Sequence, residues 1–260
     1  MSILAENIHI GKNSMIAPSV HISGVKSHAK NVYIGDNVFI GDNVQIFCDD
    51  FSIGDYSKIH HDTNIHGYKP CHIGHNAWIG QFTIIDCIGG TIIGDNCGIG
   101  AHSQLWSHIK YGDTLEGCNF SGESKLTVGN DVWFVGHCIV SPITAEDKSM
   151  ALVGSVVTRD MKYNEIYAGN PAASISHKIG YQFKAVSIEE KLQKMNQYLI
   201  DSGVNSKMIK IVASESDFKS DGLTYFAVST RRYTKNLHEE EIKFMRYLLP
   251  EKAKFVPISK

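Results

Sequence analysis

Aliphatic residues recur at every sixth position through the first two thirds of this chain. In the clearest stretch, residues 34–39 read IGDNVF and residues 40–45 read IGDNVQ. The aliphatic or aromatic heads of these steps fall in threes: Ile10/Ile16/Ile22, Ile34/Ile40/Ile46, Ile53/Ile59/Ile65, Ile73/Ile79/Ile85, Ile93/Ile99/Leu105 and Val128/Phe134/Val140. Because a six-residue step cannot bury its apolar face alone, three steps must form one coil that stacks on the next. The pattern therefore predicts a mainly β protein built as a β-helix.

The remaining positions of each step fit the inside and the corners of such a helix. Four residues after each head the side chain is small or β-branched, which suits a tight interior: Ser14, Val38, Val44, Ser57, Thr63, Ala77, Thr83, Cys97, Ser103, Val132, Cys138 and Val156. Gly in the second position and Asp or Asn in the third and fourth suit sharp corners, since these residues tolerate left-handed backbone angles. The last coil is expected to open at Glu146 and to continue through Leu152.

One interruption of the period stands out. The extra residues between Leu105 and Val128 require the segment 106–127 to leave the coil as a loop and to return. Long loops on a rigid scaffold are usually functional or disordered. The aromatic and imidazole side chains of this loop favour a structured excursion that forms part of a site; they are Trp106, His108, Tyr111 and Phe120.

The texture changes near residue 185, where the six-residue period stops. Ser187 and Glu190 form the ends of a capping-box pattern, and an apolar stripe from Ile188 to Leu199 predicts a helix that ends near Gly203. Segments 208–213 and 223–230 read as strands, and segment 236–249 reads as a second helix closed by Pro250. We expect domain 1–180 to be the β-helix and domain 185–260 to be a small α+β appendage. Its role could be to cap the open end of the β-helix, to extend a subunit contact or to form a wall of a binding site.

Three segments give the chain a family resemblance: the repeat itself, residues 128–133 (VGNDVW), and the closing stretch 154–160 (GSVVTRD) with 169–172 (GNPA). Over about residues 8–178 the chain resembles the hexapeptide-repeat acyltransferases. The similarity is to the branch of sugar O-acetyltransferases related to galactoside, maltose and surface-polysaccharide acetyltransferases. The resemblance implies a left-handed parallel β-helix, a homotrimer with active sites between subunits, and acetyl-coenzyme A as the acetyl donor.

The resemblance also implies a general base. In this branch a histidine at the start of the excursion loop, about 20 residues before the Val128-type head, has that role, and His108 lies 20 residues before Val128. Imidazole suits the task, because its usual pKa leaves it largely neutral and basic near pH 7. The chain departs from the branch in the flanking residues, which are Ser107 and Ile109 where relatives usually have Gly and Pro.

Other site residues follow from the resemblance position by position. Asp86 matches an acidic position that contacts the acceptor in some relatives, although it could equally be a corner carboxylate bonded to backbone. Trp106 and Trp133 are assigned to the acceptor; Trp133 could instead lie beside the pantetheine arm or pack against a neighbouring subunit. The coenzyme A side is assigned to five residues: Gly136, Ser155, Thr158, Arg159 and Lys178. Gly136 could also supply a backbone donor for the oxyanion, and Glu116 or Glu123 could orient the base.

Charge and cysteine content limit the binding partners and the cellular location that we expect. The net charge is −2, but residues 1–180 carry 11 basic against 17 acidic side chains and residues 181–260 carry 14 against 10. Without a long basic run, nucleic acid is not expected as a partner. The six cysteines form no C-x-x-C pair and read as reduced core thiols. With no leader-like start and no span of about 18 apolar residues, we expect a cytoplasmic protein without a membrane span.

The function expected from these observations is acetyl transfer to a sugar hydroxyl, in surface polysaccharide or glycolipid synthesis. An N-acetyltransferase for a nucleotide-linked amino sugar stays open, because it would use the same base and donor. A γ-type carbonic anhydrase shares the helix and would hold zinc through three histidines; His60, His61, His66, His72 and His75 keep this alternative open, although the closing GNPA segment would have no purpose there, and no metal is expected. A noncatalytic scaffold is disfavoured by the spacing of His108.

Overall fold

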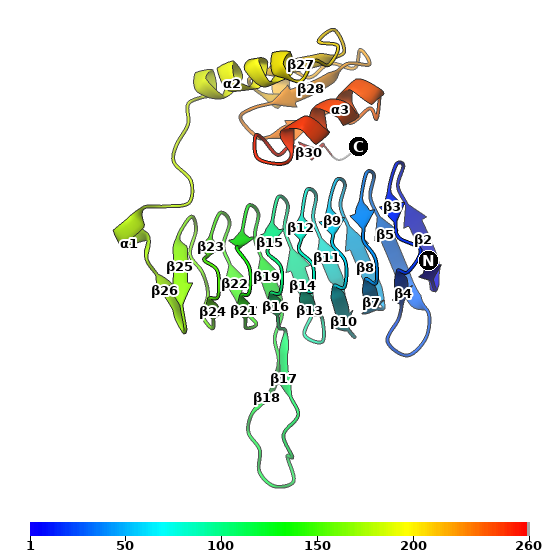
Figure 1. The fold of residues 1–260 in the computed structure, drawn as a ribbon, viewed down its shortest axis with the longest axis vertical. Helices are drawn as coiled ribbons and strands as arrows, with labels where there is room; N and C mark the ends of the chain where they lie inside the picture. Colours follow the sequence, from blue (N-terminus) through cyan, green and yellow to red (C-terminus); the bar gives the residue numbers. More distant parts are fainter. Residues whose placement is uncertain (259–260) are drawn as a thin grey trace. The chain divides into compact units, whose positions relative to one another are not determined.

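A computed structural model describes residues 1–258 of the chain, which forms two compact units, Met1–Phe183 and Lys184–Lys260. Strands make up 34% and helices 12% of the residues, so the mainly β prediction is confirmed. The first unit, called the prism below, is a left-handed parallel β-helix, as predicted (Figure 1).

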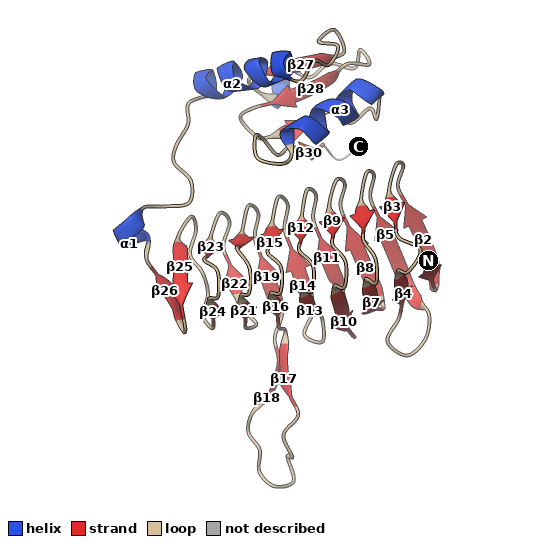
Figure 2. Ribbon diagram, viewed as in Figure 1, coloured by secondary structure: helices blue, strands red, loops and turns tan. Residues whose placement is uncertain are grey.

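Three parallel sheets form the faces of the prism (Figure 2). The first contains, in spatial order, β1 (Ser2–Ile3), β4 (His21–Ser23), β7 (Gln45–Cys48), β10 (Asn64–Gly67), β13 (Ile84–Asp86), β16 (Gln104–Leu105), β21 (Ile139–Val140) and β24 (Val156–Val157). The second contains β2 (Ala5–Ile10), β5 (Ala29–Ile34), β8 (Asp50–Ile53), β11 (Cys71–Ile73), β14 (Thr91–Ile93), β19 (Leu126–Val128) and β22 (Thr144–Ala145). The third contains β3 (Met15–Ile16), β6 (Phe39–Ile40), β9 (Lys58–Ile59), β12 (Trp78–Ile79), β15 (Gly98–Ile99), β20 (Trp133–Phe134), β23 (Met150–Ala151), β25 (Ile166–Gly169) and the antiparallel β26 (Ala172–Ser174), with α1 (Ser176–Ile179) following.

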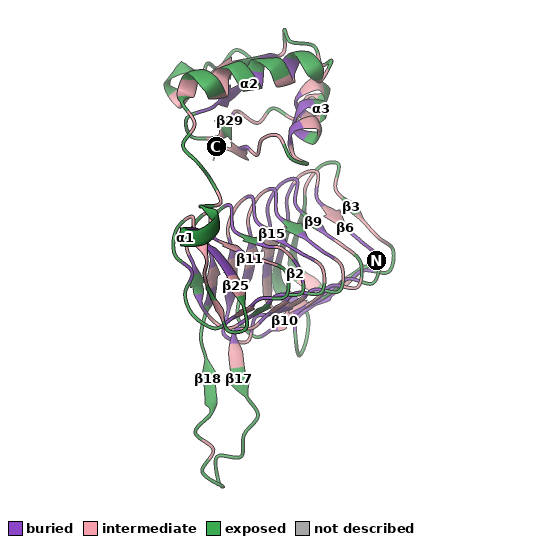
Figure 3. Ribbon diagram, turned by 60° about the vertical axis from the view of Figure 1, so that its left-hand side comes forward, coloured by how far each residue is buried: buried purple, intermediate pink, exposed green. Residues whose placement is uncertain are grey.

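The aliphatic heads stack in register and fill the interior. In the second sheet Ile34 pairs with Ile53, and the column continues through Ile73, Ile93 and Val128. Each of these side chains is at most 3% exposed. Ten of the twelve small side chains at the predicted fifth positions, such as Ser57 and Cys97, are buried as well, whereas Ser14 and Val156 near the two ends are half-buried. Figure 3 shows buried positions recurring from coil to coil of the prism. The repeat thus places the core as predicted.

The two ends of the repeat differ from the prediction. At the N-terminal end Ile10 is 41% exposed, because no coil lies beyond it. In the last coil the paired heads are Ala145, Ala151 and Val157, so the expected start at Glu146 and the head at Leu152 are wrong by one residue. The reason is a coil of 17 rather than 18 residues from Phe134 to Ala151.

The segment between Leu105 and Leu126 leaves the prism as a hairpin, called the arm below. β17 (His108–Lys110) pairs antiparallel with β18 (Ser121–Glu123), and His108 lies opposite Glu123. The arm projects away from the prism at the corner where the chain passes from the first sheet to the second (Figure 1). Its outer part exposes large apolar side chains, among them Tyr111, Leu115 and Phe120.

The second unit is a mixed four-stranded sheet with two helices. The sheet order is β27 (Ile209–Val212), β28 (Thr224–Ala227), β29 (Arg232–Tyr233) and β30 (Val256–Pro257); the helices are α2 (Ile188–Asp201) and α3 (Glu239–Leu248), with a 3-10 turn η1 (Glu215–Asp217). Both predicted helices and both predicted strands are present, and Ser187 caps α2 by accepting from Glu190 N at 3.1 Å. Phe226 centres an aromatic core, with the rings of Tyr233, Phe244 and Phe255 at 5.1–5.3 Å. The short strands β29 and β30 were not predicted.

A head in the middle of the prism should contribute more to the free energy of unfolding than a head at its end. We expect Ile79→Ala, at a fully buried head, to lower the free energy of unfolding by about 2–5 kcal/mol, because it leaves a cavity that stacked coils cannot close. Ile10→Ala removes the same atoms from a 41% exposed head and should cost about 1 kcal/mol or less. Urea unfolding followed by circular dichroism compares the two, and equal losses would contradict the stacked-column model.

Candidate active site

A buried carboxylate and an imidazole meet where the arm leaves the prism. His108 Nδ1 lies 2.8 Å from Asp86 Oδ2; the Asp86 side chain is fully buried and that of His108 is 17% exposed. An ionised carboxylate only accepts hydrogen bonds, so Nδ1 carries the proton and Nε2 is left as the basic nitrogen. The pair therefore has the arrangement of a positioned general base.

Asp86 is held by more than the imidazole. Its Oδ2 accepts from Ser107 N at 2.8 Å and from the Ser107 hydroxyl, and Ser107 Oγ accepts in turn from Gly89 N at 2.9 Å. Three donors thus converge on one carboxylate oxygen, which offsets the cost of burying it. The expectation that Asp86 contacts the acceptor is corrected here, because its side chain has no exposed surface; it positions His108 instead. Ser107, which replaces the glycine usual in the family, is a site residue that sequence reasoning missed.

Backbone packing fixes the root of the arm. Ser124 N donates to Ser107 O at 3.0 Å, so the two legs of the arm are tied together just outside the prism. Gly89 lies beneath them, and a Cβ at this position would collide with the carbonyl oxygens of Ser107 and Ser124. Only glycine allows this close approach. The imidazole is consequently positioned by the prism rather than by the exposed end of the arm.

A second imidazole lies on the other side of the same carboxylate. His66 Nε2 is 3.7 Å from Asp86 Oδ1, while His66 Nδ1 lies 2.8 Å from Asn64 Oδ1. The amide oxygen of Asn64 requires the proton of neutral His66 to sit on Nδ1. Asp86 therefore separates two imidazoles of which only that of His108 makes a short hydrogen bond to it.

Neither of the two loop carboxylates, Glu116 and Glu123, contacts the imidazole of His108 in a hydrogen bond or ion pair. Glu123 forms ion pairs with Lys110 at 2.7 Å and with Lys69 at 3.2 Å. The hydrogen bond from Lys110 is the main cause that lowers the pKa of Glu123 below its usual value. Glu116 lies exposed in the outer arm. The suggestion that either residue orients His108 is wrong, and the pairs of Glu123 instead brace the arm against the Lys69 loop.

The two predicted tryptophans lie on different parts of the prism. The Trp106 ring is 6.2 Å from the ring of His108 in an edge-on arrangement, so it borders the site. Trp133 lies on β20 in the third sheet, 45% exposed. A Cβ at Gly98 would lie 3.0 Å from Trp133 Cδ1, so the indole covers the neighbouring coil. Gly136 occupies the following corner with φ of 149°, a backbone angle that favours glycine.

Four residues after β23 are assigned to coenzyme A, and the structure buries one of them and exposes the other three. Ser155 is fully buried, and its hydroxyl donates to Leu152 O at 2.6 Å. Its assignment is corrected: the shortened last coil turns Ser155 into the small interior position, where its side chain is out of reach of a ligand. Thr158 and Arg159 are exposed just after β24, and Lys178 is exposed on α1.

The order of the first sheet relates these groups to the base. β16, β21 and β24 are successive neighbours, and strands in a sheet lie about 4.8 Å apart. The corner that follows β24, with Thr158 and Arg159, is therefore about 10 Å from the corner that follows β16 and leads to His108. Base and candidate phosphate ligands lie along one edge of the prism.

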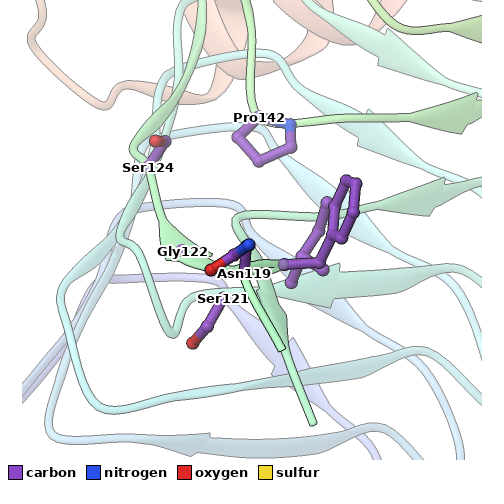
Figure 4. Close-up of a pocket in the computed structure, with 7 residues that line it drawn as sticks. Asn119, Ser121, Gly122, Ser124 and Pro142 are labelled. Atoms are coloured by element: carbon purple, nitrogen blue, oxygen red, sulfur yellow. The ribbon is translucent and has the colours of Figure 1, made fainter. Parts of the chain in front are cut away.

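A pocket of about 230 Å³ lies between the arm and the corner that follows β21. It is lined by Ile109, Asn119, Phe120, Ser121, Gly122, Ser124 and Pro142 (Figure 4). Pro142 follows β21, the strand between β16 and β24. Pro142 therefore places one wall of the pocket at the corner between the one that leads to His108 and the one that carries Thr158 and Arg159.

The histidines that suggested a zinc site are dispersed. His72 Nδ1 lies 2.8 Å from Ser52 Oγ, and His75 Nδ1 accepts from Asp55 N at 2.9 Å. His61 pairs with Asp62 at 2.7 Å. Within residues 1–258 no three side chains of the metal-binding types converge. The donor sets of a single chain do not fit a tetrahedral zinc ion.

The chain is similar in sequence to a known acetyltransferase over about half of its length. No family model matches the chain. Galactoside O-acetyltransferase of Escherichia coli (strain K12) is 29% identical over 140 residues, which cover 51% of this chain and 63% of that protein. The chain is thus similar to an enzyme of the hexapeptide-repeat acyltransferase type that the sequence motifs resemble. It spans less than two thirds of the length of this curated relative.

The solved structures that match the chain each have a TM-score below 0.5. A maltose O-acetyltransferase from Clostridium difficile 630 is 23% identical with a TM-score of 0.40, covering 55% of this chain and 68% of that one. A point mutant of AntD, an N-acyltransferase from Bacillus cereus solved with dTDP and coenzyme A, is 20% identical with a TM-score of 0.45, covering 77% and 93%. The polySia specific acetyltransferase NeuO is 21% identical with a TM-score of 0.36, covering 77% and 98%. Within residues 1–258 no helix is long and apolar enough to cross a membrane.

Removal of the Asp86 carboxylate tests its structural role. We expect Asp86→Ala to lower the free energy of unfolding by about 1–3 kcal/mol, because the buried donors of Ser107 lose their acceptor. Glu123→Ala, which removes a carboxylate from solvent-exposed ion pairs, should cost much less. Chemical denaturation of both variants gives the comparison; an Asp86 variant as stable as the wild type would show that Ser107 and His108 are held by other contacts.

Proposed function

We propose that this protein is an acetyl-coenzyme A-dependent O-acetyltransferase that modifies a hydroxyl of a sugar. The observation that carries the proposal is the imidazole of His108, oriented by buried Asp86 at 2.8 Å at the root of the arm. The similarity to galactoside O-acetyltransferase supports the reaction class. The site joins a base on a rigid coil with a pocket and with exposed Thr158 and Arg159 along the same edge.

His108 would supply the proton transfer. Its Nε2 takes the proton of the acceptor hydroxyl as the oxygen attacks the thioester carbonyl, and the resulting imidazolium is stabilised by Asp86. The tetrahedral intermediate then collapses, the C–S bond breaks, and the proton passes from His108 to the leaving thiolate. Acetyl ester and free coenzyme A are the products, so atoms and charge balance without another reactant.

The remaining groups would bind and orient the substrates. The backbone N–H of Gly136 is our candidate for the oxyanion donor, because acyl transfer requires a fixed donor where negative charge develops. Arg159 would hold a coenzyme A phosphate by charge-assisted hydrogen bonds, with Thr158 beside it and Lys178 as a further cation. Trp106 would flank the acceptor next to His108, and Trp133 would contact the acceptor from the third sheet.

The proposed assembly is a homotrimer with active sites between prisms. The exposed apolar side chains of the arm support this, since Tyr111, Leu115 and Phe120 are each at least 79% exposed in the single chain and such surfaces mark interaction sites. We place the protein in the cytoplasm, where acetyl-coenzyme A is available, and its product in the synthesis of a surface polysaccharide or glycolipid.

The base is tested by substitution. We expect His108→Ala to lower turnover by about 10²-fold or more, because proton removal from the acceptor loses its catalyst, while the affinity for acetyl-coenzyme A changes little. Thiol release with a panel of sugars measures turnover, and thermal shift measures donor binding. The matched control is His9→Ala, which removes an exposed imidazole of β2 that stacks on Tyr33. Near-normal turnover of His108→Ala would remove it from the mechanism, and transfer only to amino sugars would make the enzyme an N-acetyltransferase.

The trimer is tested by mass. Light scattering at micromolar concentration should give about three times the chain mass of 28.8 kDa. Replacing the arm residues Leu115 and Phe120 by serine should weaken the assembly, because the replaced surface is apolar. A wild-type monomer would contradict shared active sites.

A further inference from the structure

The second unit carries a pocket that the proposed chemistry does not use. It has a volume of about 500 Å³ and lies between the edge strand β27 and the segment 216–219, which contains the end of η1. Lys210 and Tyr225 contribute from the sheet, and Ser216, Phe218 and Lys219 contribute from the segment. The size falls within the range of pockets that bind small ligands.

The sheet register places a cation beside an aromatic ring. Lys210 of β27 is directly opposite Tyr225 of β28 in the parallel pair, so both side chains stand on the same face. The Phe218 ring lies 6.1 Å from the Tyr225 ring at an interplanar angle of 52°. Phe218 is half-buried and Tyr225 is buried. The pocket therefore combines an apolar ring surface with a lysine at its edge.

The lining of the pocket carries two lysines and one carboxylate. Lys210 and Lys219 are both exposed, and among the salt bridges of residues 1–258 neither is paired with a carboxylate. Asp217 is the carboxylate of the lining; its Oδ2 accepts from Ser214 N at 3.3 Å as part of a capping box. Nearby Asp221 accepts from the Tyr225 hydroxyl at 2.7 Å. The partners of both carboxylates are neutral donors, and the pKa of Asp221 is lowered by the hydrogen bond from Tyr225 and further by the charge of Lys219. Both ammonium groups are exposed, so they can pair with an anionic group of a ligand.

We propose that this pocket binds an acidic sugar residue, one that carries a carboxylate or a phosphate, of the acceptor glycan. Lys210 and Lys219 hold the anionic group by charge-assisted hydrogen bonds, the sugar ring packs on Phe218, and the exposed Ser216 hydroxyl meets a ring hydroxyl. The inference rests on the proposed sugar acetyltransferase function and specifies its substrate class. The unit as a whole carries 14 basic against 10 acidic side chains over residues 181–260, which favours an anionic ligand.

The test measures glycan binding by the full-length protein without acetyl-coenzyme A. The probes are a galacturonic acid trisaccharide, mannose 6-phosphate and neutral maltotriose, each titrated by calorimetry at two salt concentrations. We expect one or both acidic probes to bind, more weakly at high salt, and maltotriose to bind at least tenfold more weakly. The first two probes separate carboxylate from phosphate recognition.

Variants assign the binding to the pocket. Lys210→Ala combined with Lys219→Ala should weaken acidic-probe binding at least tenfold. Phe218→Ala should lower the affinity for both acidic probes. Lys191→Ala on α2 makes the same kind of charge change in the same unit outside the pocket and should leave binding unchanged. All four positions are partly or fully exposed, and circular dichroism verifies that each variant is folded.

Several results would overturn the inference. Among the probes, they are maltotriose binding as tightly as the acidic sugars, no binding of any acidic probe, or tighter binding of a single-stranded oligonucleotide. Among the variants, they are unchanged acidic-probe binding by the double lysine variant or an equal loss of binding with Lys191→Ala. Competition between coenzyme A and the acidic probes would also contradict the inference. The proposed chemistry fails separately: if acidic sugars bind at the pocket but neither they nor any other sugar is acetylated, the transferase reaction is contradicted and the pocket assignment stands.

Discussion

In-register stacking of coils is the constraint on which the rest of the prism depends. Each head lies on the head of the next coil, as in the column from Ile34 through Ile53 to Ile73, so a residue's position in the step determines whether it points inward. Neighbouring coils are separated by one strand spacing of about 4.8 Å. Groups from distant parts of the sequence therefore meet at heights that the repeat dictates, and a loop inserted at one corner begins from a fixed platform.

The candidate base uses that platform. Asp86 ends β13, and the corner carrying Ser107 and His108 follows β16, its direct neighbour in the first sheet. The carboxylate can be fully buried because the next coil supplies its donors, and burial without them would be costly. The same hydrogen bonds that stabilise Asp86 also set the tautomer of His108. Stability and positioning of the base are thus one interaction, and the exposed end of the arm can vary without disturbing it.

The sequence predicts the coils well because their signal is repeated many times, and it predicts the position of His108 at the arm's root through its spacing from Val128. The prediction fails where one coil is a residue shorter than the others. This coil of 17 residues turns Ser155 inward and makes Ala151 the head in place of Leu152. The prediction also fails where the partner is in another coil. Asp86 lies 22 positions before His108, and no local pattern distinguishes an acid beneath the arm from the other corner acids. The orienting role was consequently sought in Glu123, which is near in sequence but paired with lysines.

The second unit has no six-residue repeat, and its net charge is opposite in sign to that of the first part of the chain. Residues 1–180 carry 11 basic against 17 acidic side chains, while residues 181–260 carry 14 against 10. An anionic acceptor would be repelled by the net charge of the first part and attracted by that of the second, so a cationic binding pocket raises its local concentration near the protein. Tethering one part of a long acceptor makes the encounter of another part with the base effectively intramolecular. A short acidic sugar gains nothing from such tethering, since it cannot occupy two sites at once. For an acceptor glycan that the proposed pocket binds, the benefit would grow with glycan length until the glycan can span both sites.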